Sequence, residues 1–401
     1  MKLINQQLIK DTNLKLLYSC IYQNRGISRA ALAKQTNLSK TTVSTLVDEL
    51  IARGFILDSG TTLSPSTVGR KPNSLEIRSE KYYVPVLRWE ENYIDAHLTD
   101  ICGITMPAVR KEVGASDSYV TLSRQCIDEL IPDRISREQV LGICIVVPAM
   151  INMEKEEIYT TTLQFSPNDQ NIVSDLRTAF SDYAVAVFND TACFAYAEKI
   201  FANVSEQDFA FINFDRGIGA TLFIHNEMLG SASASYTQFG HSSVDPNGKT
   251  CLCGNRGCLE LMIGEDSLKD RLNLPGANPN FRKRDHITYA ELGRAALYGD
   301  DISKRVICDI ATQFSHALSN LICTVHPKLV VIGGKGHDLG TLFLEEIKKN
   351  IKKTGFRQMA DSVDIRFSLL DSGACFNGAM KYFFDIHYRF TQDTTGTFYL
   401  G

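Results

Sequence analysis

One short segment of the chain gathers the side chains that bind soft metal ions. Residues 240–260 place one imidazole and three thiols within 18 positions: His241, Cys251, Cys253 and Cys258. A donor set of this number and softness suits a closed tetrahedral Zn²⁺ site, and the glycines between the thiols allow tight turns. Because four protein ligands leave no position for water, we expect a structural zinc ion rather than a catalytic one. The alternative is a group of reduced cysteines that merely lie close in sequence.

The composition indicates what kind of protein must position this segment. With 401 residues, of which 44% are hydrophobic and 22% charged, the chain is long enough for two or three globular units. Its first residues lack the apolar run of a secretory signal, and its longest apolar run, near Leu141–Ile151, is too short to cross a membrane. Eleven cysteines, several of them within apolar runs, fit a reducing compartment. We therefore expect a cytoplasmic protein without a membrane partner.

Charge is distributed unevenly along the chain. Residues 1–78 contain eleven Lys and Arg against five Asp and Glu, a net charge of +6, so residues 79–401 carry −10 of the total of −4. A basic N-terminal part joined to an acidic body predicts a polyanionic partner for the first part alone.

The basic part has the pattern of a helix-turn-helix. Apolar residues at helical spacing predict a first helix over 13–23. Ser28 and Ser39 are placed to cap a second helix at 29–35 and a third that ends near Arg53. Short polar and basic side chains occupy the N-terminal end of the third helix, the end that enters the major groove in this motif. They are Ser39, Lys40, Thr41, Thr42, Ser44 and Thr45. Solvated capping residues would look similar, but the positive charge favours DNA contacts.

The segments that follow complete the first domain and begin a second. Residues 54–57 and 61–63 predict a two-stranded wing, which makes the domain a winged helix-turn-helix. Beyond residue 79, β-rich and helical segments alternate, which predicts α/β lobes. Strands are expected at 82–87, 140–147, 184–188, 209–213, 329–332 and 363–368, and helices at 118–130, 172–180, 191–202, 289–298 and 302–325.

The spacing of the metal-binding segment, G-H-x9-C-x-C-G-x-x-G-C-x-E, resembles the signature of the ROK family of sugar kinases and sugar-responsive repressors. The resemblance implies a winged helix-turn-helix at 1–78, then a two-lobed ROK body of the actin and hexokinase type at 79–401. We expect its lobes at roughly 82–188 with the C-terminal helix, and at 189–374. An arginine after the wing can reach a minor groove in ROK repressors, and Arg70 and Lys71 match that element.

The resemblance also assigns sugar contacts. ROK kinases carry an Asn-Asp pair after a strand, and its Asp is the general base on the sugar hydroxyl. Asn189 and Asp190 match this pair, although they could also cap the following helix. The family's Glu-x-Gly-His element runs here from Gln238 to His241, with the acidic charge lost, and Glu260 matches a further sugar contact. Zinc bound through His241 would then hold the sugar-contacting residues in position without touching the sugar itself.

The two phosphate-binding loops of ROK kinases are altered in this chain. Residues 88–92 match the first loop, Asp-x-Gly-Gly-Thr, with Glu90 and Glu91 in place of both glycines. Residues 215–219 match the second loop, Gly-Thr-Gly-x-Gly, which has gained Asp215. Where side chains replace glycine, phosphate cannot approach the backbone N–H groups of the loop closely, and the added carboxylates would repel a triphosphate. We therefore expect no sugar phosphorylation.

These observations predict a transcriptional repressor of carbohydrate-related genes. It would sense a sugar or sugar derivative and bind an operator in double-stranded DNA as a homodimer or a dimer of dimers. One alternative is a sugar kinase that carries a DNA-binding domain, which Asp190 favours. Another is a regulator with a vestigial cleft that a protein partner controls. That alternative is favoured because the segment around Thr161 and Thr162 lacks the family's upstream sugar-binding Asn.

Overall fold

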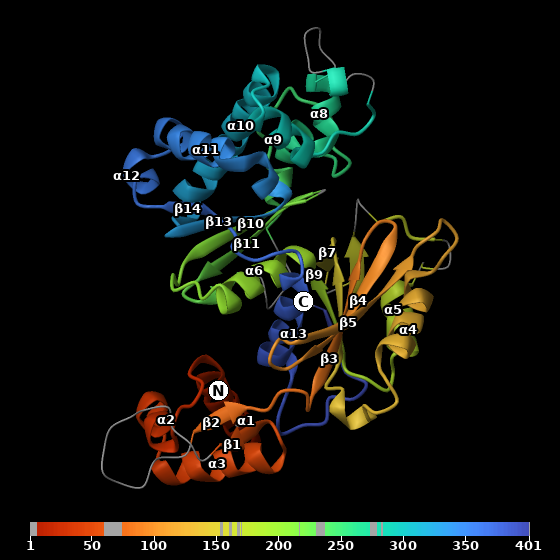
Figure 1. Ribbon diagram of the computed structural model, residues 1–401, viewed down its shortest axis with the longest axis vertical. Coiled ribbons are helices and arrows are strands. Elements are labelled where there is room, and N and C mark those ends of the chain that lie inside the picture. Colours follow the sequence, from red (N-terminus) through yellow and green to blue (C-terminus); the bar gives the residue numbers. More distant parts are fainter. Residues whose placement is uncertain are drawn as a thin grey trace. The chain divides into compact units, whose positions relative to one another are not determined.

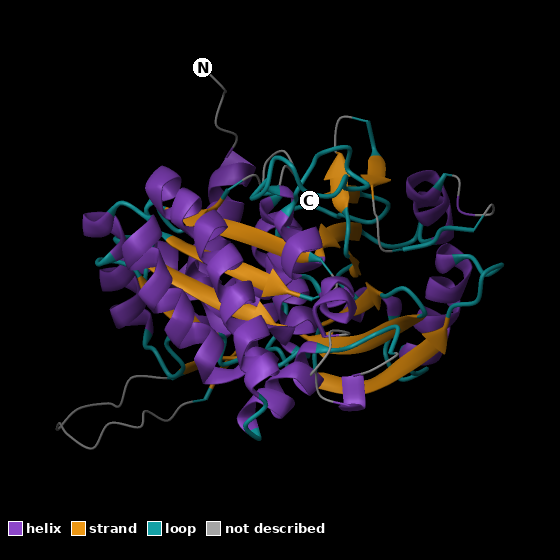
Figure 2. Ribbon diagram, turned by 90° about the horizontal axis from the view of Figure 1, so that it is seen from above, coloured by secondary structure: helices purple, strands orange, loops and turns teal. Residues whose placement is uncertain are grey.

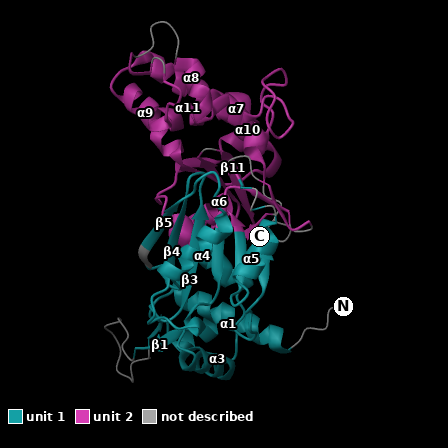
Figure 3. Cartoon of the chain, turned by 90° about the vertical axis from the view of Figure 1, so that its right-hand side faces the viewer, with its two compact units in different colours: residues 1–145, 165–187, 379–399 teal, residues 146–164, 188–378, 400–401 magenta. Residues whose placement is uncertain are grey.

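The computed structural model describes residues 6–59, 74–152, 155–159, 163–166, 169, 171–215, 217–229, 237–272, 279–281 and 284–400. The described chain forms two compact units (Figures 1 and 3). The first draws on residues 1–145, 165–187 and 379–399, and the second on 146–164, 188–378 and 400–401. Helices and strands are mixed throughout, as expected for an α/β protein (Figure 2). None of the described helices combines the length and apolar character that a membrane crossing requires.

Three helices and a small sheet form the N-terminal part of the first unit. The helices are α1 (Gln6–Gln23), α2 (Arg29–Thr36) and α3 (Lys40–Ala52). The side chains of Ser28 and Ser39 accept hydrogen bonds from Ala31 N and Thr42 N, which confirms both predicted caps. Apolar side chains of α1 and α3 are buried, as the helical spacing of apolar residues predicts: Leu14, Leu17, Val43, Leu46, Val47 and Leu50.

The wing differs in one strand from the sequence-based expectation. Strand β1 (Ile56–Asp58) overlaps the predicted strand at 54–57, but its described partner is β2 (Leu75–Ile77), in antiparallel register. Residues 61–63, which we expected to pair with the first strand, lie outside the described residues. The local pattern missed β2 because only three residues form it, and a strand this short carries almost no periodicity.

A six-stranded sheet forms the core of the rest of the first unit, in the order β15-β9-β6-β3-β4-β5. Within this unit α4 (Tyr119–Leu130) and α5 (Ile172–Ala179) cover one face of the sheet, and the end of α13 (Ala374–Tyr382) lies on the other (Figure 1). Every residue of β6 is buried, which explains its uninterrupted apolar sequence. The strands are β3 (Tyr83–Trp89), β4 (Tyr93–Asp100), β5 (Thr105–Glu112), β6 (Ile143–Val147), β9 (Val185–Asn189) and β15 (Phe398–Leu400).

The second unit contains a five-stranded sheet in the order β12-β11-β10-β13-β14. Side chains of β10 alternate between its faces: Phe211 stacks on Phe194 of α6, whereas Phe214 packs against Phe314 of α10 and Phe343 of α11. The strands are β10 (Phe209–Phe214), β11 (Ile218–Ile224), β12 (Glu227–Met228), β13 (Leu329–Gly334) and β14 (Asp364–Phe367). The longer helices are α6 (Asp190–Phe201), α9 (Tyr289–Leu297), α10 (Asp301–Val325) and α11 (Gly340–Thr354).

Smaller elements complete the second unit. They are the paired strands β7 (Met150–Asn152) and β8 (Glu157–Tyr159), and the short helices α7 (Leu259–Ile263), α8 (Glu265–Leu272) and α12 (Arg357–Ala360). All of the strands and helices expected in the body are present, with boundaries shifted by a few residues. The pattern missed β4, β5, β7, β8, β11, β12, β15, α7, α8, α11, α12 and α13. The predicted division into domains at residue 78 stays a prediction.

Candidate metal, sugar and DNA sites

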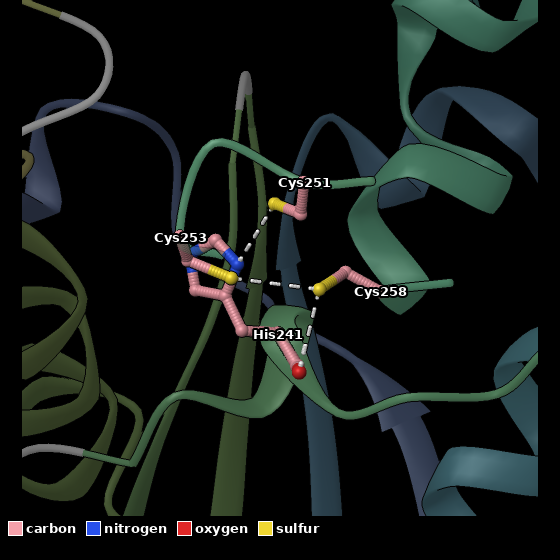
Figure 4. A group of neighbouring side chains, drawn as sticks. All are labelled: His241, Cys251, Cys253 and Cys258. Carbon is pink, nitrogen blue, oxygen red and sulfur yellow. Dashed lines mark hydrogen bonds between the residues drawn. The ribbon is translucent and has the colours of Figure 1, made fainter. Parts of the chain in front are cut away.

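The four predicted metal ligands come together in the second unit (Figure 4). Their ligand atoms all lie within 4.8 Å of one another. The Nδ1 atom of His241 is 3.6 Å from the Sγ of Cys251, and the sulfur atoms of Cys253 and Cys258 are 3.7 Å apart. Cys251 and Cys258 are buried, whereas Cys253 is exposed. The sequence therefore identified a real cluster.

Glycine backbone geometry explains why the thiols converge. Gly254 and Gly257 both have positive φ, at +90° and +60°. A Cβ atom on Gly257 would lie 1.7 Å from the carbonyl oxygen of Asp245, so no other residue fits there. The N–H of Cys251 donates to the carbonyl of Asn255 at 2.7 Å, which closes the turn that carries two of the three thiols.

The geometry of the cluster fits a metal ion. Zn–S bonds of about 2.3 Å at tetrahedral angles place two sulfur atoms roughly 3.8 Å apart, close to the 3.7 Å between Cys253 and Cys258. One nitrogen and three sulfurs form the soft donor set that holds zinc in structural sites. The cluster can therefore bind a metal ion.

Asn189 and Asp190 occupy the start of α6. The side-chain oxygen of Asn189 accepts from Ala192 N at 3.1 Å, and its Nδ2 donates to the carbonyl of Ala149 at 2.9 Å. Oδ1 of Asp190 accepts from the N–H of Thr191 at 2.7 Å. The capping role considered from the sequence is thus present at Asn189, and Asp190 is the first residue of the helix.

The predicted sugar-binding segments converge on the beginning of β11. Glu260 accepts a hydrogen bond from Ile218 N through Oε2, at 3.0 Å. A Cβ atom on Gly240 would lie 2.4 Å from the carbonyl oxygen of Ile218, so the segment that holds Gln238 and His241 packs closely there. A Cβ on Gly219 would likewise lie 2.3 Å from Oγ1 of Thr191, the neighbour of Asp190.

This convergence places three distant segments of the sequence at one locus of the second unit. Gln238 is exposed, and His241 and Glu260 are partly buried. Because His241 directs Nδ1 toward the thiols, its Nε2 is the nitrogen on the opposite edge of the ring. Thr161 and Thr162, the predicted counterparts of the upstream contact, lie outside the described residues.

The segment that matches the first phosphate loop is an ordinary β-hairpin turn. The N–H of Glu90 donates to the carbonyl of Tyr93 at 2.9 Å. The hydroxyl of Tyr119 donates to the carbonyls of Glu90 and Glu91, at 2.8 and 3.0 Å. Arg88 pairs with Glu90 across 2.8 Å. Hydrogen bonds and an ion pair between protein groups therefore hold this turn in place.

An ion-pair cluster occupies the segment that matches the second phosphate loop. Nζ of Lys335 lies 3.0 Å from Oδ1 of Asp215 and 3.4 Å from Oε2 of Glu265. Glu265 also accepts from Tyr289 N at 2.8 Å. Burial lowers the pKa of Lys335, but the two carboxylates outweigh it and the pKa is raised. Sequence reasoning identified Asp215 but missed Lys335, although it lies in the glycine-rich segment 333–336.

The predicted DNA-binding residues differ in what their side chains contact. Oγ of Ser39 caps α3 and lies 2.8 Å from Oγ1 of Thr42, and the hydroxyl of Ser44 accepts from Arg29 at 3.1 Å. Lys40, Thr41 and Thr45 are exposed. Arg70 and Lys71 lie outside the described residues.

The fold and these sites define a class of protein. A winged helix-turn-helix precedes two α/β units of the sugar-kinase type, and the two segments that match phosphate loops are held by internal hydrogen bonds and ion pairs. This architecture is that of a DNA-binding transcriptional regulator rather than a sugar kinase.

The chain belongs to the ROK family, whose model matches residues 93–385, and a winged helix-turn-helix DNA-binding model matches residues 10–56. It is 27% identical to the xylose repressor of Caldicellulosiruptor bescii, over 94% of this chain and 96% of that protein. Its fold resembles the crystal structure of a ROK family transcriptional regulator, a homolog of the Escherichia coli Mlc protein, with a TM-score of 0.78, 21% identity and 97% coverage of both chains. A ROK family glucokinase from Streptomyces griseus, solved with glucose and AMPPNP, gives a TM-score of 0.59, 18% identity and coverage of 74% of this chain and 98% of its own.

Proposed function

We propose that this protein is a cytoplasmic repressor of carbohydrate-related genes that binds an aldose in its ROK body without phosphorylating it. One observation carries the proposal. The predicted sugar-binding segments converge on the start of β11, whereas Lys335 pairs with Asp215 where a kinase would bind phosphate. The predicted division supports it as well, with a DNA-binding domain at 1–78 and a sensing body at 79–401.

The proposed sugar contacts are Asn189, Asp190, Gln238, His241 and Glu260. Carboxylates, amides and an imidazole are the groups that hydrogen-bond several hydroxyls at once. Similarity to a protein named xylose repressor makes D-xylose the first sugar to test. Gln238, which lacks the acidic charge expected in this family, is proposed to donate as well as accept.

We assign the metal cluster to structural zinc. Three thiols and an imidazole fill all four positions of a tetrahedral site, which leaves none for a substrate. The metal would hold the segment 241–258, and with it both His241 and the helix α7 that begins beside Cys258 and carries Glu260.

We propose that Ser39, Lys40, Thr41, Thr42, Ser44, Thr45, Arg70 and Lys71 form the DNA-binding surface, with α3 as the recognition helix. Since Ser39, Thr42 and Ser44 have partners within the domain, their role is to set the position of the helix. Lys40, Thr41 and Thr45 are the side chains proposed to reach DNA. A homodimer would match two operator half-sites.

A thermal-shift screen tests the sensing function. D-xylose, D-glucose, N-acetylglucosamine and their phosphates are each added with and without Mg-ATP. We expect one free sugar to raise the Tm to the same extent with or without nucleotide. Stabilisation by Mg-ATP alone, or sugar-dependent ATP consumption that disappears in Asp190→Asn, would instead establish the kinase alternative.

A matched pair of variants tests the site. Glu260→Gln removes the charge at the proposed locus, and hydrogen bonds to charged groups contribute about 1.5–3 kcal/mol, so the sugar Kd should rise about 10- to 100-fold. Glu227→Gln, which changes an exposed residue of β12 in the same unit, should leave the sugar Kd unchanged. Equal Kd values for both variants in calorimetry would remove Glu260 from the site.

A further inference from the structure

The DNA-binding helices are fastened to the C-terminal segment, defined here as residues 383–391. Oδ1 of Asp11 on α1 accepts from the backbone N–H groups of Phe390 and Thr391, at 2.6 and 3.3 Å. Asp11 is only 2% exposed. Lys15, one turn further along α1, donates to the carbonyl of Asp385 at 2.8 Å. A buried carboxylate that bonds two backbone N–H groups holds its partner in one geometry.

Arg53 fastens the recognition helix to the same segment. Arg53 is the C-cap residue directly after α3, and its guanidinium donates to the carbonyl of Phe390 at 2.5 Å and to the hydroxyl of Tyr388 at 3.3 Å. The hydroxyl of Tyr82 in turn donates to the carbonyl of Arg53 at 2.5 Å. The C-terminal end of α3 therefore moves with the C-terminal segment.

Aromatic rings fill the space between these polar contacts. The ring centroids of Tyr18 on α1 and Phe384 are 4.7 Å apart. Those of Phe55, just beyond α3, and Phe390 are 4.9 Å apart. Phe384 also stacks on Tyr388 at 5.0 Å. All five rings are buried. Close packing of this kind transmits displacement instead of absorbing it.

The other end of the connection leads to α6. The C-terminal segment begins as a π-helical turn, Phe383–His387, that continues α13. In the middle of α13, a Cβ atom on Gly378 would lie 2.0 Å from the carbonyl oxygen of Cys193 and 3.0 Å from the Cβ of Ala197, both on α6. Helix α6 in turn begins at Asp190, with Asn189 as its cap.

We propose that α13 and the C-terminal segment transmit sugar occupancy at the start of α6 to the recognition helix, and that Arg53 is the positioning residue at the end of this route. The proposal rests on the proposed function of the Asn189–Asp190 locus. Each step is a close contact between named elements: α6 with α13 at Gly378, then the π-helical turn, then α3 through Arg53. Single π-helical turns occur frequently at functional sites, and this one joins α13 to the residues that contact Arg53.

The experiment compares Arg53→Ala with Arg29→Ala in the full chain. The two arginines are matched, since their side chains are 32% and 30% exposed, but Arg29 pairs with Asp48 and Asp58 inside the winged domain. Operator affinity is measured by fluorescence anisotropy on a duplex selected from random DNA by the wild-type protein. D-xylose and D-glucose are each added in turn, and their own Kd values are measured by calorimetry.

For the wild type we expect sugar to change the operator Kd by about 5- to 150-fold. In Arg53→Ala the ratio of the operator Kd with sugar to that without sugar should fall to less than about twofold, while the sugar Kd stays unchanged. Arg29→Ala should weaken operator binding but keep this ratio at the wild-type value. If Arg53→Ala does not fold, Tyr388→Phe, which removes only one hydroxyl, and Arg53→Lys decide the question. The first should reduce the ratio, and the second should retain part of it.

Two results would overturn the proposal in distinguishable ways. A folded Arg53→Ala or Tyr388→Phe variant that keeps the wild-type ratio would remove the C-terminal route and leave the sugar-sensing function intact. A wild-type protein whose operator affinity responds to neither sugar would remove the route and the proposed sensing of these sugars together.

Discussion

Lys335 and Asp215 form an ion pair with 3.0 Å between Nζ and Oδ1, in two loops that match nucleotide-binding elements of ROK kinases. Glu265, 7% exposed, shares the same lysine. A kinase must keep such loops open toward phosphate, because catalysis of phosphoryl transfer consists mostly of positioning and charge stabilisation. Here Lys335 already pairs with Asp215 and Glu265, and the three groups together keep a net negative charge, which disfavours a bound triphosphate.

Replacement of this lysine should lower stability. Lys335→Met leaves the buried Glu265 without its cation, so we expect the free energy of unfolding to fall by about 1–2 kcal/mol, reduced from the full buried value because Lys335 itself is partly exposed. Urea unfolding measures the loss. Lys349→Met, which breaks an exposed pair with Glu346 on α11, should cost less than about 0.5 kcal/mol. Equal losses of unfolding free energy in the two variants would show that the Lys335 ion pair stabilises the protein no more than an exposed pair does.

Loss of one thiol should remove the metal. Cys253→Ser takes away one of four ligands, so we expect the zinc content by elemental analysis to fall from about one ion per chain to near zero, together with a lower Tm. Cys323→Ser changes an exposed cysteine that lies outside the cluster and serves as the control. Full zinc content in Cys253→Ser would rule out the proposed ligand set.

Lys40 should contribute to DNA binding through charge alone. Each phosphate contact releases counterions, so Lys40→Ala should reduce the slope of log K against log salt by about 1 and weaken binding to all sequences alike. Titrations of a fluorescent duplex at several salt concentrations measure the slope. Lys353→Ala, on the exposed surface of α11, is the control. An unchanged slope for Lys40→Ala would place this residue away from the phosphates.

The C-terminal segment should make stability depend on pH. Burial, then the nearby charges of Lys15 and Arg389, lowers the pKa of His387 to about 4 from its usual 6.5. Between these values the unfolded chain binds the proton and the folded chain does not, so stability is complete above pH 6.5 and falls toward pH 4. The loss should be up to about 3 kcal/mol. His387→Phe should show a smaller decrease in urea unfolding between pH 6.5 and 4.5, and an identical decrease would exclude His387 as the cause.

Features encoded by neighbouring residues were predictable. The His/Cys cluster spans only residues 241–258, and the caps at Ser28 and Ser39 act on residues three positions away, so spacing alone located these features. The resemblance to ROK kinases assigned sugar contacts to Asn189, Asp190 and Glu260 through short motifs, and these assignments stay predictions.

Features that depend on distant residues were not predictable from the pattern. Lys335 and Asp215 are separated by 120 positions, and nothing local indicates that their charges meet. The same holds for Asp11 and the backbone of Phe390, whose sequence separation is 379. Strand β2 was missed because it pairs across the segment 60–73 with only three residues. Pairing and tertiary ion pairs are decided by the fold as a whole, not by periodicity.

The bond between Asp11 and Phe390 has a consequence for protein synthesis. The ribosome makes α1, α3 and Phe55 first, yet the rings and N–H groups that pack against them, residues 384–391, are made hundreds of residues later. During elongation the nascent DNA-binding helices lack these partners, and a prematurely terminated chain never acquires them. The packing around the DNA-binding helices is therefore complete only in chains translated through residue 391.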